Sequence, residues 1–427
     1  MEVVPRNRRP YSTLEKLEMK KTLVALAAVS AVSAFAQTTV SITGLFDAGY
    51  RSTTVGNAPA KSQKIITNNN AGTSQVDFVI TEDLGGGLKA IAYGEADFQS
   101  VKPNLTNGSA TNSANWYTGA FFNSEIYVGL TSATAGTIKL GAPNSEFLLG
   151  NAKVQPFGTA LGGGYSNTFG RMGTNANVGI NGFFAAGETA RVVRNERTVK
   201  YDSPVFNGAQ VVVEWSPGNS LGTGTTGTST SDGTNYSSNN NAWSATTLNY
   251  GNGPLTLTYS TGQVSAGANV SAGTVVTSGT YAAGKLTANN AVNYTLYGGN
   301  YVVNPALTVY AGATTTKSSN TTSGGTDLED SRSINYAVKY TVGQVDILFN
   351  RLQRTSNLTV DTYQTPNGNS SLTGLGLNYN LSKNTMVYGR YEKASNVVAI
   401  AGTTTATTAN SAYGAQTITA AGLMVKF

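Results

Sequence analysis

The last thirteen residues, 415–427, constrain the fold of this chain more than any other stretch. Alternate positions of an extended strand share one face, and here one face becomes apolar towards its end, at Leu423, Val425 and Phe427. Terminal strands of soluble proteins usually continue into loose polar residues, because chain ends fray unless something ties them down. A strand that stops on an aromatic ring instead indicates the closing strand of a membrane β-barrel, with the ring in an aromatic girdle. The alternative is an edge strand of a β-sandwich.

The composition excludes several kinds of chemistry and favours a barrel wall. The 427 residues include no Cys and no His, so metal, thiol and imidazole chemistry are excluded, and a serine nucleophile would lack its usual base. A glycosidase with paired carboxylates is not excluded by residue type, but no spacing favours it. We therefore predict neither an enzyme nor a cofactor. Only 12% of the residues are charged, while 49 Gly and 22 Tyr indicate many short strands joined by turns.

The first 36 residues have the pattern of an export signal. Lys20 and Lys21 precede an apolar run over 23–32, and Ala34-Phe35-Ala36 supplies a small-x-small cleavage site. We expect residues 1–36 to be a signal peptide, with 1–18 an extension upstream of a natural start at Met19, and 37–427 to be the mature domain. Removing six of the 28 basic and three of the 22 acidic residues leaves a net charge of +3, so nucleic-acid binding gains no support.

Segments with a period of two alternate with connections that are short, then long, then short again. They lie at 40–51, 75–83, 88–98, 125–132, 137–142, 197–203, 209–216, 242–250, 255–261, 290–297, 306–313, 333–341, 345–354, 372–381, 385–393 and 415–427. An even number of strands, with short turns at one end and long loops at the other, is typical of outer-membrane barrels. The sequence therefore predicts one domain, an all-β transmembrane antiparallel barrel of sixteen strands. Alternation alone fits a β-sandwich equally well, so a secreted or surface-anchored adhesin is the alternative function.

Six short sequence motifs are distributed along the chain. They are 40–49 (VSITGLFDAG), 82–90 (EDLGGGLKA), 127–130 (YVGL), 199–204 (VKYDSP), 379–383 (YNLSK) and the ending 423–427 (LMVKF). With these motifs the chain resembles the general bacterial porins, in particular the trimeric sixteen-stranded porins of Burkholderia-like Gram-negative bacteria. The resemblance implies a trimeric outer-membrane channel for passive diffusion of small hydrophilic solutes and ions, whose third long loop folds into the barrel. It also implies contact with outer-membrane lipid and lipopolysaccharide, and an assembly machinery that reads the terminal Phe427.

The chain departs from that family at three positions where arginines are usual. Here these positions are Gln75, Ser124-Glu125 and Ala142, whereas Lys200 keeps the charge of a fourth family arginine. The arginine ladder that makes many relatives anion-selective is therefore partly missing. We expect a weak anion preference rather than a strong one.

The longest connection, 143–194, is too long to be structureless in a compact protein unless it has a function. As a constriction loop it would place charged residues at the narrowest part of the channel. These are Glu146, Lys153, Arg171, Glu188, Arg191 and Arg194. The alternative is a solvated extracellular flap.

Charged residues also fall on the polar faces of the predicted strands. They are Asp47, Lys89, Glu95, Asp97, Lys139, Lys200, Glu214, Lys339, Asp346, Arg390 and Glu392. Taken singly, each is more often a solvated strand residue than part of a gate. Together they predict a wet pore wall, because unpaired charges on a dry face would be costly. On the opposite face of the third strand, Ala90, Ala92, Gly94 and Ala96 form a stripe of small residues where we expect subunit contact.

Overall fold

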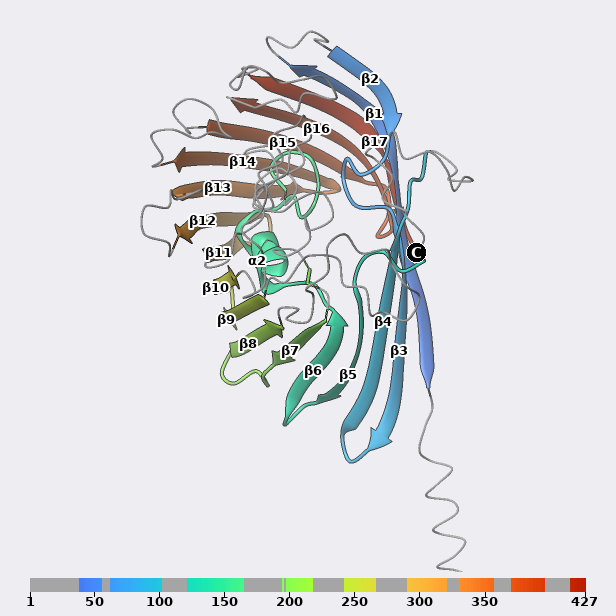
Figure 1. Cartoon of the computed structure of the whole chain (residues 1–427). Helices are drawn as coiled ribbons and strands as arrows, with labels where there is room; N and C mark the ends of the chain where they lie inside the picture. Colours follow the sequence, from blue (N-terminus) through green and yellow to red (C-terminus); the bar gives the residue numbers. More distant parts are fainter. Residues whose placement is uncertain are drawn as a thin grey trace, which may run out of the picture.

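The structure is a computed structural model, shown in Figure 1, that describes ten stretches of the chain. These are 38–55, 62–101, 121–164, 194–195, 197–217, 242–265, 290–320, 330–356, 370–395 and 415–427. The predicted signal peptide lies outside the described residues, as do Arg171, Glu188 and Arg191 of the predicted constriction loop. No helix among the described residues is long and apolar enough to cross a bilayer.

The described chain consists almost entirely of strands, with one short helix inside them. The strands are β1 (Thr39–Val55), β2 (Ser62–Thr67), β3 (Gln75–Gly85), β4 (Leu88–Asp97), β5 (Ile126–Ser132), β6 (Gly136–Ala142), β7 (Thr198–Asp202), β8 (Ala209–Ser216), β9 (Ala242–Asn252), β10 (Leu255–Ser265), β11 (Asn290–Asn304), β12 (Leu307–Asn320), β13 (Asp330–Val342), β14 (Val345–Ser356), β15 (Ser370–Asn380), β16 (Thr385–Ser395) and β17 (Gln416–Lys426). The helix is α2 (Glu146–Val154).

The strands form one closed antiparallel sheet, which confirms the predicted sixteen-stranded barrel. From β3 to β17 each strand pairs with the next, and β17 pairs back with β1 from Leu45↔Lys426 to Val55↔Gln416. On its other edge β1 pairs with β3 near its start and with β2 near its end, so β2 and β3 share one of sixteen positions. A β-sandwich would require two sheets, and the described strands form only one. The adhesin alternative therefore loses its support.

The first long connection differs from the prediction. The sequence indicated a loop from the end of the first strand to Gly72, because Asn, Gly and Thr fill this stretch. The structure instead extends β1 to Val55 and adds β2 opposite it, and among the described residues between β2 and β3 the stretch 68–74 is irregular. Strand pairing explains the difference, because β1 offers a free edge to any extended segment beside it.

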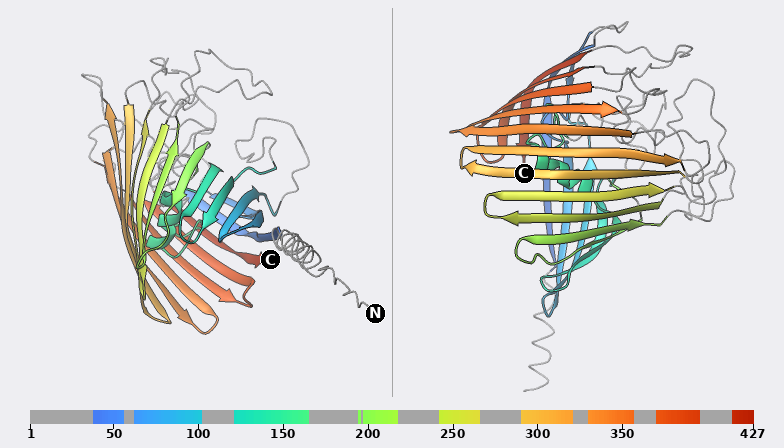
Figure 2. Two further views of the ribbon diagram at one scale, coloured as in Figure 1. Left: turned by 90° about the horizontal axis from the view of Figure 1, so that it is seen from below. Right: turned by 90° about the vertical axis from the view of Figure 1, so that its left-hand side faces the viewer.

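The pairing register assigns every strand an inner and an outer face. On the outer face lie exposed apolar side chains, for example Val213 and Trp215 on β8 and Leu375 and Leu377 on β15. The alternate residues point inward, towards the space that α2 enters (Figures 1 and 2). Exposed apolar surface on one side and polar residues on the other suit a wall between lipid and water.

Candidate functional site

The described first part of the long connection, 143–164, folds inside the barrel. After β6 the chain enters α2, whose first turn is capped by the Ser145 hydroxyl, an acceptor for the Leu148 N–H at 3.3 Å. The helix lies against β10 to β13. At its end Asn335 Nδ2 donates to the Val154 carbonyl at 2.6 Å, and further on Asn350 Nδ2 donates to that of Gly163 at 3.1 Å. The predicted inward fold of the third long loop is thus confirmed for its described part.

Glycines on the inner wall let α2 approach closely. A Cβ added at Gly312 of β12 would lie 2.7 Å from the Val154 Cβ, and one added at Gly298 of β11 would lie 2.8 Å from its Cγ1. Both distances are shorter than real carbon contacts, so no larger residue fits at either position without a shift. Phe147 and Val154 are almost fully buried against the wall.

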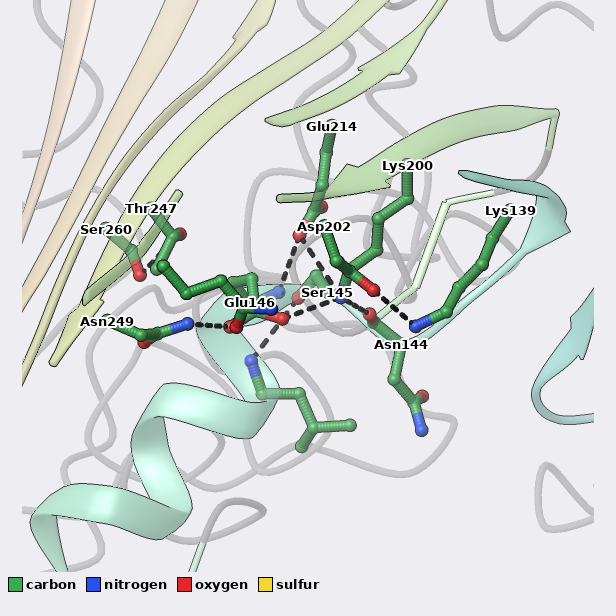
Figure 3. Close-up of polar contacts among 12 residues, drawn as sticks. Lys139, Asn144, Ser145, Glu146, Lys200, Asp202, Glu214, Thr247, Asn249 and Ser260 are labelled. Carbon is green, nitrogen blue, oxygen red and sulfur yellow. Dashed lines mark hydrogen bonds and ion pairs between the residues drawn. The ribbon is translucent and has the colours of Figure 1, made fainter. Parts of the chain in front are cut away.

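A buried ionic network joins the first turn of α2 to β7 and β8 of the wall, as Figure 3 shows. Lys200 Nζ of β7 lies 2.7 Å from Glu146 Oε1 and 3.9 Å from Glu214 Oε1 of β8. Glu214 also accepts the Glu146 backbone N–H at 2.6 Å and the Trp243 Nε1–H at 3.0 Å. All three charged side chains are buried, so each depends on the others for solvation.

The Glu146 carboxylate is held in its charged form by these partners. Burial alone would raise the pKa of Glu146, but the Lys200 ammonium, an Asn249 amide donor at 2.9 Å and Lys153 more than offset burial and lower it. Lys153, in the last turn of α2, donates to Asn249 Oδ1 at 2.6 Å and keeps about a quarter of its side chain exposed (26%). Burial lowers the pKa of Lys153, while Glu146 opposes that shift.

Carboxylates of the inner wall bind the backbone of the inward segments. Asp47 Oδ2 of β1 accepts the N–H groups of residues 70, 71 and 72 at 2.6, 2.7 and 3.2 Å, so the irregular 68–74 stretch folds over it. Glu392 of β16 accepts the Gly162 N–H at 2.9 Å, and Glu125 accepts the Asn144 N–H at 2.8 Å. The two inward segments also meet, because the Leu161 N–H donates to the Asn70 carbonyl at 3.0 Å. Wall carboxylates therefore serve as anchors.

The register places all eleven predicted wall residues on the inner face. Directly paired residues share a face, as in the pairs Lys200↔Glu214 and Lys139↔Lys200. Seven of them are nevertheless buried, contrary to the predicted wet wall: Asp47, Glu95, Lys200, Glu214, Asp346, Arg390 and Glu392. Inward backbone N–H groups bind three of these, Asp47, Glu214 and Glu392. Asp346 instead contacts Thr341, Asn380 and Lys339 of the wall itself. Lys89 is exposed, and Asp97, Lys139 and Lys339 are partly exposed.

Of the predicted loop residues, Glu146 and Lys153 lie at the two ends of α2. Arg194 forms a β-bridge with Asn144, and its Nε donates to the Asn144 side chain at 3.0 Å. Sequence reasoning missed Asn249 and Glu125, both central to the site. Glu125 was seen only as a replaced arginine, and no local pattern identifies Asn249, whose partners come from a distant part of the chain.

Comparisons with known proteins agree with this geometry. A profile of the Gram-negative porin family matches residues 22–399. An outer membrane porin protein of Bordetella pertussis is 27% identical over 272 residues, which span 60% of this chain and 63%, less than two thirds, of that relative. Among solved structures, an anion-selective porin from Comamonas acidovorans has a TM-score of 0.62 at 18% identity, covering 92% of this chain and 100% of its own. The trimer form of OmpT from Vibrio cholerae has a TM-score of 0.56 at 13% identity, covering 91% and 99%.

Proposed function

Because the chain belongs to the Gram-negative porin family, we propose that it forms a water-filled channel through which small hydrophilic solutes and ions diffuse passively across the outer membrane. The observation that carries the proposal is the inward path of 143–164, held to the inner wall of a closed barrel by Glu214 and Glu392. A loop fixed across the lumen narrows the passage without sealing it, and so limits the size of what crosses.

The channel is expected to have a weak anion preference. Five of the six predicted acidic wall residues are buried, and several of these are already used as hydrogen-bond acceptors by inward backbone N–H groups. The accessible charges among the predicted residues are mainly basic, namely Lys89, Lys139, Lys153, Lys339 and Arg194. Asp77, Glu125 and Asp202 on the same inner face oppose them, and Asp202 pairs with Lys139 at 2.8 Å. A small positive surplus within the roughly 8 Å Debye length of physiological salt biases permeation only modestly.

Planar-bilayer recording tests both parts of the proposal. The purified protein should give steady single channels with a reversal potential that favours chloride in a potassium chloride gradient. Arg194→Glu, alone or with Arg191→Glu, should reduce or invert that preference, whereas Arg332→Glu on the outer face should leave it unchanged. No channel activity would contradict the channel itself, and a clear cation preference in the wild type would contradict only the charge assignment.

The channel is proposed to be a homotrimer whose contact includes Ala90 and Ala92 of β4, whereas Gly94 and Ala96 of the predicted stripe are buried within the chain, Gly94 under the Phe122 ring. The register places Ala92 on the outer face, opposite Val128, and small residues allow close approach of a second surface. Ala92→Arg should shift detergent-extracted protein from trimer to monomer on a native gel. Val213→Arg, on the outer face of β8, is the control and should leave the oligomer intact. An unchanged oligomer in Ala92→Arg would contradict this contact.

Export and assembly complete the proposal. Residues 1–36 act as the signal peptide, and Phe427 marks the chain for the outer-membrane assembly machinery. The backbone of Phe427 closes a pair of hydrogen bonds with Gly44 at 3.0 and 3.1 Å, so the last residue also belongs to the seam of the barrel. In the membrane the outer face meets lipid and lipopolysaccharide.

A further inference from the structure

The side of α2 that faces the lumen is apolar apart from one lysine. The side packed on the wall is formed by Phe147, Gly150, Asn151 and Val154. With about 3.6 residues per turn, Leu149, Ala152 and Lys153 lie on the opposite side of the helix. Leu149 is 41% exposed and Ala152 is exposed, although α2 lies inside the barrel (Figure 1). The lumen therefore meets an apolar patch with an ammonium group beside it.

The Lys153 ammonium has donor capacity left for an anion in the lumen. It donates to Asn249 Oδ1 at 2.6 Å, and the Glu146 carboxylate lies 3.9 Å away with Lys200 as its closer cation at 2.7 Å. An ammonium group carries three donors, so one hydrogen bond to Asn249 does not exhaust it. Lys153 follows Leu149 by four residues, which brings their Cβ atoms to about 5–6 Å from each other. This spacing suits a small molecule with an apolar body and one anionic group.

The wall across the lumen also presents apolar surface. Counting strands round the closed barrel, β1, β3, β4 and β5 lie half-way round from β10 to β13, against which α2 packs. On their inner face Val79 pairs with Tyr93, and Tyr93 with Tyr127, in one row across three strands. Val79 is 37% exposed, and the two tyrosine rings are stacked with their centroids 5.6 Å apart. The lumen is therefore bordered by apolar or aromatic side chains on two facing sides.

The charges beside that row favour an anion over a cation. Lys139 Nζ lies 5.4 Å from the centroid of the Tyr127 ring and is partly exposed. The carboxylates nearby are engaged in the wall: Asp77 accepts the Gln75 amide at 2.8 Å, and the buried Glu95 accepts the Tyr93 hydroxyl at 3.2 Å. A cation at the edge of a narrow, low-dielectric passage raises the local concentration of anions.

Binding sites for small molecules combine an apolar lining with a few polar groups that fix orientation. Taking the chain to be the channel proposed above, we propose that the lumen side of α2 is a subsite for small organic anions with an apolar body, such as aromatic monocarboxylates. Leu149 and Ala152 contact the body, and Lys153 pairs with the carboxylate. Covering about 50 Å² of apolar surface tightens binding roughly tenfold, so the subsite distinguishes an aromatic carboxylate from a carboxylate without an apolar body.

Ligand-observed NMR titration of the full-length protein in detergent, with benzoate and with acetate, tests the subsite. Benzoate should bind the wild type roughly tenfold more tightly than acetate. Leu149→Gln keeps a good helix former but removes the apolar surface, so it should lower the affinity for benzoate to that for acetate and leave acetate unchanged. Leu149→Met, which stays apolar, should bind benzoate like the wild type. Leu381→Gln, at a 51% exposed leucine beside a short turn, is the matched control and should also bind benzoate like the wild type.

A second variant separates the charge from the apolar contact. Lys153→Gln should weaken benzoate and acetate by the same factor, up to about fivefold, because a partly exposed ion pair is lost for both ligands. Benzylammonium, which has the same ring and the opposite charge, should bind the wild type more weakly than benzoate.

Four outcomes would overturn the inference. They are equal affinity of the wild type for benzoate and acetate, wild-type benzoate affinity in Leu149→Gln, an equal loss in Leu149→Met and Leu149→Gln, and benzylammonium that binds as tightly as benzoate. Single-channel recording in potassium chloride reports the proposed function separately. A wild type that forms no channel would contradict that function, while the titration would still decide whether the subsite exists.

Discussion

Replacing Lys200 with Met should release α2 from the wall while the barrel itself stays folded. The substitution keeps the length of the side chain and removes the only cation within 3 Å of Glu146 in the described network. Glu146 and Glu214 then remain as two buried carboxylates without their shared partner, with side chains 6% and 3% exposed. Removing one member of a buried ion pair costs about 3–5 kcal/mol, because the remaining charge is left unsolvated.

That cost destabilises the conformation in which α2 is bound to the wall. The barrel itself is not affected, because the wall strands keep their hydrogen-bond ladders. At about 1.4 kcal/mol per factor of ten, the ratio of released helix to helix bound to the wall should rise by about two to three and a half orders of magnitude. Lys139→Met is the matched control. Lys139 pairs with Asp202 at 2.8 Å on the neighbouring strands, is partly exposed and belongs to a pair within the wall, so its loss should cost about 1 kcal/mol or less.

Single-channel recording is the assay. Lys200→Met should show larger and less steady conductance, with frequent transitions between levels, while Lys139→Met should keep the steady levels of the wild type. Adding Glu214→Gln to Lys200→Met should restore part of the steady behaviour, because the amide removes one orphaned charge and still accepts a hydrogen bond. Heat-modified mobility on gels should be normal in all variants. If Lys200→Met gave traces indistinguishable from those of Lys139→Met, the network would not be what holds the loop.

Three further predictions concern the packing of α2 against the wall, the charge of Lys153 and the end of the chain. Gly312→Val should displace the helix by collision with Val154 and change the conductance, whereas Gly389→Ala, where a Cβ meets nothing within 4 Å, should not. Equal conductance in both variants would count against the role of Gly312 in the packing of α2. Because burial lowers the pKa of Lys153, this lysine should lose its charge at a lower alkaline pH than an ordinary lysine. The anion preference, measured as a reversal potential, should therefore fall as the pH rises through that range. Lys153→Gln should show a smaller anion preference without that pH dependence. Deleting Phe427 should lower the amount of folded barrel in outer-membrane fractions far more than the conductance of what assembles, and normal membrane levels would refute it.

The faces of the barrel could be predicted from the sequence because their period is short and strict. Once Val213 and Trp215 are assigned to the lipid side, Glu214 must point inward, since a slip of one residue would exchange the two faces completely. The same alternation predicted Lys200 on the inner wall, and the register of the structure pairs it with Glu214. Local alternation therefore carried the prediction of the fold and of which charges face the lumen.

What local alternation could not predict is which inner charges meet water. Asp47 is buried because the 68–74 stretch folds onto it, and that stretch has no apolar periodicity to reveal its path. The short helix had one local signal, the pair Ser145 and Glu146 at a capped first turn, but Gly150 in its middle weakens any helix prediction. Its position depends on contacts with strands more than a hundred residues away, which a single sequence does not display.

The pairing of β1 with β17 has a consequence for the order of events during folding. Leu45 and Lys426 are about 380 residues apart, whereas most neighbouring strands are joined by a short turn or a moderate loop. Each doubling of a closing loop costs about 0.6 kcal/mol, so joining the first strand to the last costs about 3 kcal/mol more than closing a ten-residue turn. The seam is therefore expected to form last, after the whole chain has been exported. Until it forms, β1 and β17 each present an unpaired edge that any extended segment of another chain can join.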